Sequence, residues 1–455
     1  MTFFGSLSDP PATFVLTGAR LVDPRAGSDR VGDLAVVDGQ LTDPAAAPAD
    51  APRFDGSGLV AAPGLCDLHA HLREPGMERA ETIESGARAA AHGGFTTVCA
   101  MPNTEPAIDS PGLVAEMIAR GGAAGAARVL PIATITRGRK GRELADLVEL
   151  AAAGAVAFSD DGSPVEDGRL FRSALEYARV TGRPVIEHAQ DLALSAKGVM
   201  HEGAVSARLG LPGMPAAAEE TAVARDIALA KMTGGLLHLT HLSTAGSIEL
   251  VRRAKADGVP ITCDVTPHHL AMTDDWVAGS RAFAWEVPDE ALQGVPYDSS
   301  TKVNPPLRGQ ADVRALWAGI ADATVDAIAT DHAPHASVKK EVEFDQAAFG
   351  ISGLETALAL VLGGVRVHWA PMGAVIDALT IGPARVLGIQ LQGDDWIAID
   401  VDAEWLVTAD ELQSKGKNTP ILGRTLIGRA VHVSMAGEAK LEGRRVRNAE
   451  AVVRR

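Results

Sequence analysis

Two histidines near the start of the chain give the first indication of chemistry. His69 and His71 stand two apart in the run DLHAHLREPG, residues 67–76. Alternate residues of a strand share one face, so both imidazoles would leave the same side of a strand end. Neutral imidazole is the commonest side-chain ligand of zinc and related ions. The pair alone is a weak signal, because two half-buried polar side chains give the same pattern.

Further candidate ligands come directly after short apolar runs later in the chain: Asp160 or Asp161, His188, His241 and Asp331. Each has an ordinary explanation, since a strand-end Asp often caps a helix and a single His is usually a satisfied core residue. Together with the first two histidines, however, they would place six nitrogen and oxygen ligands at one rim. We therefore predict a centre of two divalent metal ions, with zinc as first choice and manganese or cobalt as alternatives.

Two divalent ions a few ångströms apart repel each other strongly unless an anion lies between them. In many two-metal barrels a carboxylated lysine of the fourth strand has this role. This chain has no lysine between Lys140 and Lys197, so that strand cannot supply one. Asp160 and Asp161 remain, and because neighbouring strand residues face opposite sides, only one of the two should contact the ions.

Eight short apolar runs, separated by helical segments, would position these ligands. The runs are Leu65–His69, Phe95–Met101, Arg128–Ile135, Ala155–Ser159, Pro184–His188, Leu236–His241, Pro260–Asp264 and Ala327–Thr330. Helices are predicted between them at Ala80–His92, Ser110–Arg120, Gly168–Val180 and Ala217–Met232. Eight such alternations predict an α/β fold, a (β/α)₈ TIM-like barrel with functional groups at the carboxyl ends of the strands. An open doubly wound sheet would normally show a glycine-rich turn after its first strand, where this chain has His-Ala-His.

Strand signals at the two ends of the chain predict a second, small domain. One group comprises Thr13–Val22, a hairpin over 33–41 with an Asp-Gly turn, and Phe54–Ala62. After helices at 353–362 and 371–387, the other group comprises Trp396–Val401, Ala403–Val407, Thr425–Ala430 and Val431–Met435. We expect residues 1–62 and 389–455 to join into a small β-sandwich domain beside a barrel formed by residues 63–388.

The composition argues against several other classes of protein. The 455 residues carry a net charge of −16 without a basic stretch, which disfavours binding to nucleic acid or to an anionic membrane. No apolar run has membrane-spanning length, and residues 1–11 lack the basic and apolar blocks of a signal peptide. Three cysteines without Cys-x-x-Cys spacing indicate reduced thiols. We expect a cytoplasmic enzyme that acts on a small molecule.

Six motifs along the chain carry a family resemblance: DLHAHLREPG (67–76), GGFTTVCAMPNTEP (93–106), FSDDG (158–162), CDVTPHHL (263–270), NPPLR (304–308) and ATDHAPHA (329–336). Together they resemble the long-chain bacterial dihydroorotases of the amidohydrolase superfamily, and the resemblance covers nearly the whole chain. It implies reversible hydrolysis of the cyclic amide of L-dihydroorotate to N-carbamoyl-L-aspartate in de novo pyrimidine biosynthesis.

The resemblance also implies roles for individual residues. The metal ligands would be His69, His71 and Asp331 at one ion, His188 and His241 at the other, and Asp161 as the bridge. Asp331 would also be the catalytic proton shuttle, moving a proton from a metal-activated hydroxide to the departing ring nitrogen. The substrate contacts would be made by His71, Arg73, Asn103, Asn304, His335, Phe349 and Gly350.

Arg73 and Asn103 can also be interpreted from their positions. Arg73 stands two residues beyond His71, where its planar and permanently charged guanidinium could bind the carboxylate of dihydroorotate. Asn103 follows the second predicted strand and could add a hydrogen bond. The structural alternatives are that Arg73 pairs with Glu74 and that Asn103 only forms a turn.

Two other functions compete with this one. A related cyclic amidase, such as a hydantoinase or an allantoinase, would usually have the strand-four lysine and lack the arginine after the histidine pair. A non-catalytic partner of aspartate transcarbamoylase would have lost metal ligands, and none is missing here. A complex with that enzyme and a homodimer stay open as predictions.

One segment departs from the family pattern. The connection 273–301 is acidic, contains tryptophan and is longer than usual. Among a lid, an interface and a surface insertion, we expect a surface insertion.

Overall fold

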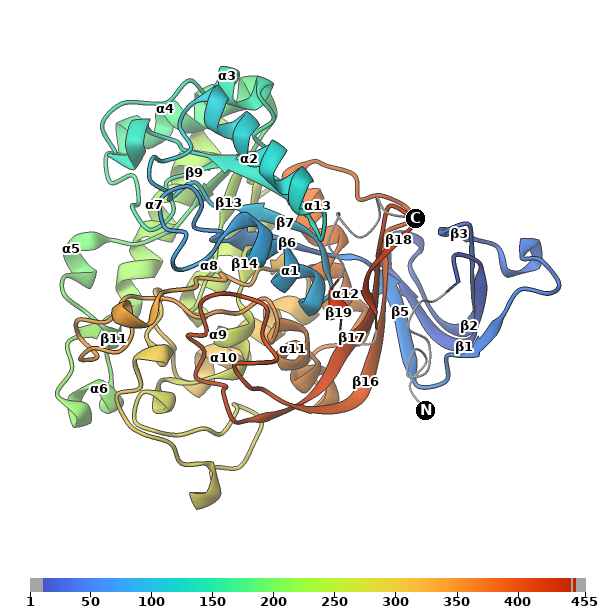
Figure 1. Ribbon diagram of the computed structural model, residues 1–455. Coiled ribbons are helices and arrows are strands. Elements are labelled where there is room, and N and C mark those ends of the chain that lie inside the picture. Colours follow the sequence, from blue (N-terminus) through green and yellow to red (C-terminus); the bar gives the residue numbers. More distant parts are fainter. Residues whose placement is uncertain (1–10, 443–444, 447–455) are drawn as a thin grey trace.

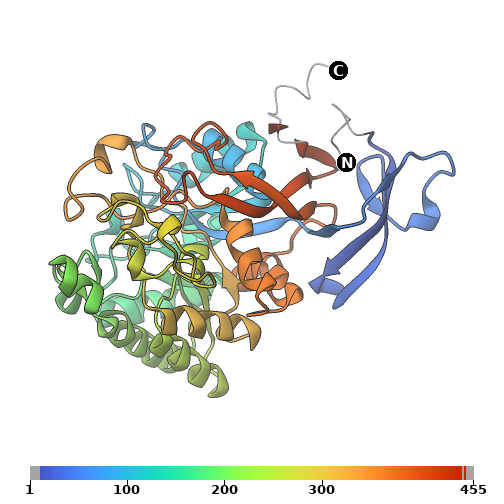
Figure 2. The same ribbon diagram turned by 90° about the horizontal axis from the view of Figure 1, so that it is seen from below.

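The structure is a computed structural model that describes residues 11–442 and 445–446. A barrel of parallel strands surrounded by helices makes up most of it, and a smaller sheet built from both ends of the chain lies at one side (Figure 1). The view turned by 90° shows the same division, with the first strands far from the barrel (Figure 2). Among the described residues, no helix is both long enough and apolar enough to span a membrane.

All eight predicted barrel strands are present, and each pairs in parallel with the next one. They are β6 (Leu65–Ala70), β7 (Phe95–Ala100), β8 (Arg128–Ala133), β9 (Ala157–Ser159), β10 (Val185–Glu187), β13 (Leu237–Leu239), β14 (Ile261–Val265) and β15 (Ala327–Ile328). Every residue of β6, β7, β9, β10, β13 and β15 is buried, as expected for a parallel sheet covered on both faces. The predicted barrel is confirmed.

The barrel closes between its first and last strands, β6 and β15. Ala70 and His332 form a single parallel bridge, and His71 N donates to His332 O at 2.8 Å. The Asp67 carboxylate completes this seam, because it accepts from Thr330 N at 2.8 Å and from Thr330 Oγ1 at 2.6 Å. A buried carboxylate therefore joins the two strands where ladder hydrogen bonds would otherwise run.

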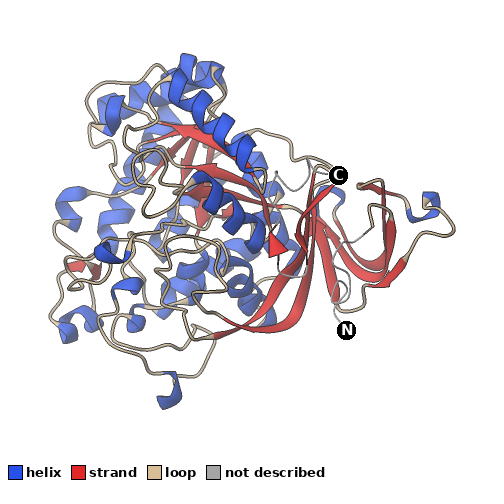
Figure 3. Ribbon diagram, in the orientation of Figure 1, coloured by secondary structure: helices blue, strands red, loops and turns tan. Residues whose placement is uncertain are grey.

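Helices cover the outside of the barrel (Figure 3). They include α1 (Ile83–Gly93), α2 (Pro111–Ala124), α3 (Leu147–Ala152), α4 (Gly168–Ala178), α7 (Ala216–Thr233), α8 (Ala245–Ala256), α10 (Gln310–Ala321) and α11 (Ala357–Arg366). The connections also contain α5 (Leu192–Ser195), β11 (Met200–His201), α6 (Ala204–Leu209), β12 (Gly213–Met214) and α9 (Pro267–Ala271). The chain then passes through α12 (Met372–Leu379) and α13 (Ile381–Leu387) to the small sheet.

Capping chemistry decides where the helices begin and end. α1 begins after Thr82, later than predicted, because Thr82 Oγ1 accepts from Ser85 N at 3.1 Å and caps the first turn. It ends at Gly93, and the residue that follows, Gly94, has a φ of 98° that suits a residue without a Cβ. The single helix predicted over 371–387 is two helices, since Thr380 leaves the helical conformation with φ −132° and ψ −82°.

The strands at the two ends of the chain form one mixed sheet. They are β1 (Phe14–Asp23), β2 (Ser28–Val37), β3 (Gln40–Thr42), β4 (Arg53–Asp55), β5 (Leu59–Pro63), β16 (Trp396–Leu406), β17 (Thr425–Met435), β18 (Glu438–Glu442) and β19 (Arg445–Val446). The order is β19-β18-β17-β16-β5-β1-β2-β3, with β4 beside β1. Antiparallel pairing of β5 with β16 joins the two ends, so the predicted shared β domain is confirmed. Its boundaries at residues 62 and 389 stay a prediction.

Two details of this sheet differ from the prediction. The strand expected over Phe54–Ala62 is two strands, because the chain turns at residues 57–58. The two pairs of short strands expected after residue 395 are the single strands β16 and β17, whose pairing shifts between Asp400 and Glu404 without ending. The hairpin turn at 38–39 matches the prediction, with φ of 51° and 82°.

The connection 273–301 is not merely a surface insertion. Trp276 and Phe283 are buried and pack in one cluster with Trp405 and Leu426, which belong to β16 and β17. These aromatic side chains therefore help to hold the barrel and the small domain together. The expectation of a surface insertion is wrong for them.

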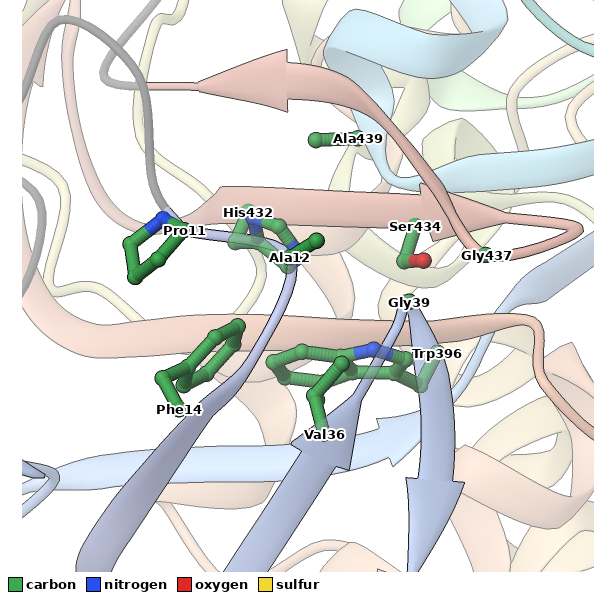
Figure 4. Close-up of a pocket in the computed structure, with 10 residues that line it drawn as sticks. All are labelled: Pro11, Ala12, Phe14, Val36, Gly39, Trp396, His432, Ser434, Gly437 and Ala439. Atoms are coloured by element: carbon green, nitrogen blue, oxygen red, sulfur yellow. The ribbon is translucent and has the colours of Figure 1, made fainter. Parts of the chain in front are cut away.

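The small domain also holds a cavity of about 130 Å³. Figure 4 shows Phe14 and Trp396 on one side of it, and His432 and Ser434 on the other. None of the predicted site residues is among those that line it, so the predicted chemistry belongs to the barrel.

Candidate metal centre

Five strand ends bring the six predicted ligands together at one end of the barrel. They are His69 and His71 at the end of β6, Asp161 after β9, His188 after β10, His241 after β13 and Asp331 after β15. All six side chains are buried. Parallel strands end at the same rim, so residues as far apart in the chain as His71 and Asp331, 260 positions, meet here.

Asp161 lies at the centre of this cluster. Its Oδ1 is 3.5 Å from Nε2 of both His69 and His241, and 3.6 Å from His188 Nδ1. Its Oδ2 is 3.6 Å from His71 Nε2. Two groups of three possible ligands therefore share this carboxylate, one on the β6 side and one on the β10 and β13 side. A carboxylate that bridges two ions needs this arrangement.

The neighbouring Asp160 points away from the cluster. Its carboxylate accepts from Ile135 N at 2.9 Å, from Thr136 N at 3.1 Å and from the Thr136 hydroxyl. It therefore fixes the chain after β8. Only one of the two adjacent carboxylates faces the histidines, in keeping with the opposite directions of neighbouring side chains.

Asp331 completes the cluster beside the histidines of β6. Its Oδ1 is 3.0 Å from His71 Nε2 and 3.5 Å from His69 Nε2. Asp331 and His241 have φ of 46° and 42°, in the left-handed region that residues with a Cβ rarely adopt. Strained backbone of this kind concentrates at functional sites.

Supporting hydrogen bonds decide which nitrogen of each β6 histidine carries the proton. Thr240 Oγ1 donates to Asp264 Oδ2 at 2.9 Å, so it accepts from His69 Nδ1, 2.8 Å away. Asn103 Oδ1 lies 2.8 Å from His71 Nδ1 and is also an acceptor. Both rings thus donate through Nδ1, and their Nε2 atoms face the two carboxylates, where either a proton or a metal ion can lie.

The other pair of histidines is oriented from the opposite side. The Gln190 amide nitrogen donates to Ser195 Oγ at 2.7 Å, and Gln190 Oε1 accepts from His188 Nε2 at 2.7 Å. His188 therefore presents its Nδ1 lone pair, 2.9 Å from His241 Nε2. Asn304 Nδ2 donates to the same Gln190 oxygen at 2.8 Å, which places Asn304 on this side.

These residues fit a pair of divalent ions. His71 Nε2 lies 3.0 Å from Asp331 Oδ1, and His69 Nε2 is buried without a hydrogen-bond partner among the described residues. A cation between these atoms would give each lone pair a partner. Four imidazoles and two carboxylates are a nitrogen and oxygen donor set that suits zinc, manganese or cobalt.

Both carboxylates of the cluster are ionised at neutral pH. Burial alone would raise the pKa of Asp161, but the surrounding imidazoles, above all His69, outweigh burial and hold that pKa well below its usual range. Burial also opposes ionisation of Asp331, and there the contact with His71 prevails and lowers the pKa. Metal ligands need this anionic form.

Arg73 is buried beside the cluster and lacks an anionic partner. No carboxylate of the described residues lies within 4.0 Å of its guanidinium, whose Nε donates to Pro334 O at 3.1 Å. Glu74, the alternative partner, pairs with Arg120 and accepts from Ile83 N at 2.9 Å. Burial lowers the pKa of Arg73 to about 10, so it stays charged at pH 7. A carboxylate ligand would satisfy this buried cation.

Three other predicted substrate residues lie on the same side of the cluster as Arg73, namely His335, Phe349 and Gly350. These four residues are here called the pocket wall. His335 Nε2 lies 3.5 Å from Arg73 Nη2 and donates to Phe349 O at 2.7 Å. Burial and the Arg73 charge lower the pKa of His335 to about 3, so its ring is neutral at pH 7. Gly350 has φ of 133°, and a Cβ there would lie 2.6 Å from Ala333 Cβ, so only glycine fits.

The sequence interpretation missed the residues that hold the ligands in place: Asp67, Gln190, Thr240 and Asp264. Asp67 stands two residues before His69, and Asp264 ends the seventh predicted strand, so strand position was a usable signal for both. Thr240 and Gln190 neighbour histidine ligands, but their residue types alone do not mark them.

A closed parallel barrel with four histidines and two aspartates at its carboxyl rim defines the amidohydrolase class. Solved structures agree with this fold. The L-hydantoinase (dihydropyrimidinase) from Arthrobacter aurescens matches with a TM-score of 0.80 at 22% identity, over 95% of this chain and 97% of that chain. A dihydropyrimidinase from Brevibacillus agri matches with 0.76 at 18% identity, over 96% of each chain. At these identities the likeness shows the fold alone.

The chain belongs to the dihydroorotase family. It is 49% identical to the dihydroorotase of Anaeromyxobacter sp. (strain K) over 431 residues, which are 93% of this chain and 96% of that protein. It is 48% identical to the dihydroorotase of Pelotomaculum thermopropionicum over 446 residues, 95% and 99% of the two chains. The Dihydro-orotase-like family profile matches residues 58–247, the part that contains all the predicted metal ligands except Asp331.

We expect Thr240→Val to weaken metal binding about 10- to 100-fold, because valine removes the acceptor that keeps the His69 proton on Nδ1. The measurement is a competition titration of the protein against a chromophoric chelator. Thr96→Val is the matched control, since its buried hydroxyl donates to Leu65 O at 3.4 Å and not to a ligand. An unchanged affinity in the Thr240 variant would contradict this role.

Proposed function

We propose that this protein acts as a dihydroorotase, which reversibly hydrolyses the cyclic amide of L-dihydroorotate to N-carbamoyl-L-aspartate in de novo pyrimidine biosynthesis. Relatives of that name are 49% and 48% identical over nearly the whole chain. The observation that carries the proposal is Arg73, a buried guanidinium without a carboxylate partner among the described residues, beside a cluster of metal ligands. Dihydroorotate has a ring amide for the cluster and a carboxylate for the guanidinium.

Six residues would hold two divalent ions, for which zinc is the first choice. They are His69, His71 and Asp331 at one ion, His188 and His241 at the other, and Asp161 at both. Ions bound there would lower the pKa of a shared water molecule and polarise the ring carbonyl of the substrate. Asp161 supplies the anion that two adjacent dications need, in the place where many related barrels use a carboxylated lysine.

Asp331 is the proposed proton carrier. Its carboxylate lies at the edge of the cluster, 3.0 Å from His71 Nε2, and its lowered pKa keeps it ionised at neutral pH. In hydrolysis it would accept the proton of the attacking water and return it to the ring nitrogen as the C–N bond breaks. In the biosynthetic direction the same carboxylate would take the proton from that nitrogen.

Arg73 and Asn103 are the proposed partners of the substrate carboxylate, and His335 is a proposed contact of the substrate beside them. A guanidinium can hold a carboxylate through two parallel hydrogen bonds, which fixes the orientation of the ring. Asn103 links this wall to the metal ligands, because its Oδ1 orients His71 and its Nδ2 lies 3.4 Å from Asp161 Oδ2. The alternative that Asn103 only forms a turn does not account for these contacts.

The ring amide groups have proposed partners on both sides of the cluster. Asn304 Oδ1 is buried and has no hydrogen-bond partner among the described residues, so it can accept from a ring N–H. The backbone at Phe349 and Gly350 would contact the ring from the wall that contains His335, and His71 would contact it from the metal side.

The competing functions explain less of the structure. Hydantoinases share the fold, but a hydantoin ring without a carboxylate would leave Arg73 buried and unpaired. A solely non-catalytic partner of aspartate transcarbamoylase would not need two overlapping groups of buried metal ligands. A complex with that enzyme, a homodimer and a cytoplasmic location are kept as parts of the proposal.

L-Dihydroorotate should be the preferred substrate over hydantoin and allantoin, and Arg73→Met should remove that preference. We expect kcat/KM for dihydroorotate to fall by the equivalent of about 2–5 kcal/mol, because the substrate carboxylate would then be buried without a cation. Steady-state kinetics with the three substrates measure this. Arg120→Met is the matched control at an arginine that pairs with Glu74 outside the cluster. Normal kinetics in the Arg73 variant would refute the carboxylate assignment.

Asp331→Asn should lower kcat about 10²- to 10⁴-fold at saturating zinc, because the amide keeps the shape but cannot accept the proton. Bound metal is measured in the same samples, so that loss of turnover can be separated from loss of a ligand. Near-normal turnover with both ions bound would remove Asp331 from the proton pathway.

A further inference from the structure

A connection of the small domain reaches the substrate side of the barrel. Residues 407–424, here called the β16–β17 connection, leave the small sheet, pass over the barrel and return (Figure 1). They contact the segment 332–352 that follows β15. That segment carries three proposed substrate contacts, namely His335, Phe349 and Gly350.

Asn418 is the main point of contact in this connection. Its Oδ1 accepts from His335 N at 2.8 Å. Its Nδ2 donates to Ala333 O and to Gly350 O, both at 3.0 Å. The residue is 7% exposed, so water hardly competes for these bonds. One amide therefore joins the stretch that carries His335 to the stretch that carries Gly350.

The backbone around Asn418 lies equally close to the barrel. Ser352 N donates to Asn418 O at 3.1 Å, and Ser352 Oγ donates to Gly416 O at 2.6 Å. A Cβ on Gly416 would lie 2.6 Å from Pro334 Cβ and 2.7 Å from His335 N, so no larger residue fits there. A shift of the connection would therefore move His335 with it.

Lys340 supports the same wall from within the segment 332–352. Its ammonium is buried and donates to Ala348 O at 2.8 Å and to Gly350 O at 3.0 Å. The Gly350 carbonyl thus receives one donor from the barrel segment and one from the small domain, through Asn418. Both its position and its orientation are fixed by these two donors.

We propose that Asn418 is a positioning residue for substrate binding, which holds His335 and the Gly350 backbone where they meet the carboxylate end of a cyclic amide substrate. The proposal rests on the dihydroorotase function proposed above. The hydrogen bonds of Asn418 go to the pocket wall and not to the metal ligands, so its loss should affect affinity for the substrate. The small domain thereby contributes to the active site.

Asn418→Asp tests the proposal with almost no change of shape. A carboxylate oxygen would replace the amide donor opposite the Ala333 and Gly350 carbonyl oxygens, and their repulsion should open the wall. In the full-length, zinc-loaded enzyme we expect KM for L-dihydroorotate to rise at least about tenfold, with kcat changed less than about threefold. Zinc content should equal that of the wild type. Asn418→Ala, which adds no charge, should show the same split with a smaller rise in KM.

Gln413→Ala is the matched control on the same connection. The Gln413 side chain accepts from Arg88 Nη2 at 2.9 Å. Among the described residues it makes no hydrogen bond to the segment 332–352. Both KM and kcat should therefore stay within about twofold of the wild type.

A double-variant cycle with Lys340→Met separates positioning from general loosening of the fold. Lys340 and Asn418 donate to the same Gly350 carbonyl, so their effects on KM are coupled. We expect the double variant Asn418→Ala, Lys340→Met to raise KM clearly less than the product of the two single effects. Effects that simply multiply would contradict a shared action on this carbonyl.

The proposal is overturned if both Asn418 variants have the KM of the wild type, or if they lose only apparent kcat, in proportion to lost zinc or lost folded protein. The proposed function fails separately, if the wild type hydrolyses another cyclic amide and not dihydroorotate. In that case the same comparison of KM with kcat on the accepted substrate decides the role of Asn418.

Discussion

The structure depends on how four buried imidazoles and two buried carboxylates are kept together. Asp161 lies within 3.6 Å of a nitrogen of each of the four rings. Thr240, Asn103 and Gln190 bind the outer nitrogens of three of these rings, so the inner lone pairs point into one space. Buried groups of this kind are costly without a positive charge between them, and the proposed pair of metal ions would supply it.

Barrel closure and assembly of the site depend on the same side chain. Asp67 accepts from Thr330 N and Oγ1 across the seam, and also from His69 N at 3.2 Å. One carboxylate therefore joins the first strand to the last, sets the backbone of a histidine ligand and holds the residue before Asp331. Asn418 makes a similar link farther from the cluster, because it connects the small domain to the wall that contains Arg73 and His335.

How much could be predicted from the sequence depends on how far apart in the chain the interacting residues are. Barrel strands could be predicted because buried parallel strands are short apolar runs, and the ligand positions because each follows such a run. The end of the helix predicted over 371–387 could not, since a single residue, Thr380, interrupts it. The pairing of Glu74 with Arg120, 46 residues away, could not be predicted either. The same holds for the contact of Asn418 with His335, which lies 83 residues away. Such contacts exist only in the folded chain.

The most direct test of the central claim is stepwise reconstitution with metal. Protein stripped by a chelator is titrated with zinc, while bound zinc and L-dihydroorotate hydrolysis are measured in the same samples. Two ions held around Asp161 predict that the stripped protein is inactive and that activity rises to a plateau at two zinc ions per chain. Full activity in protein shown to contain no metal would contradict the account.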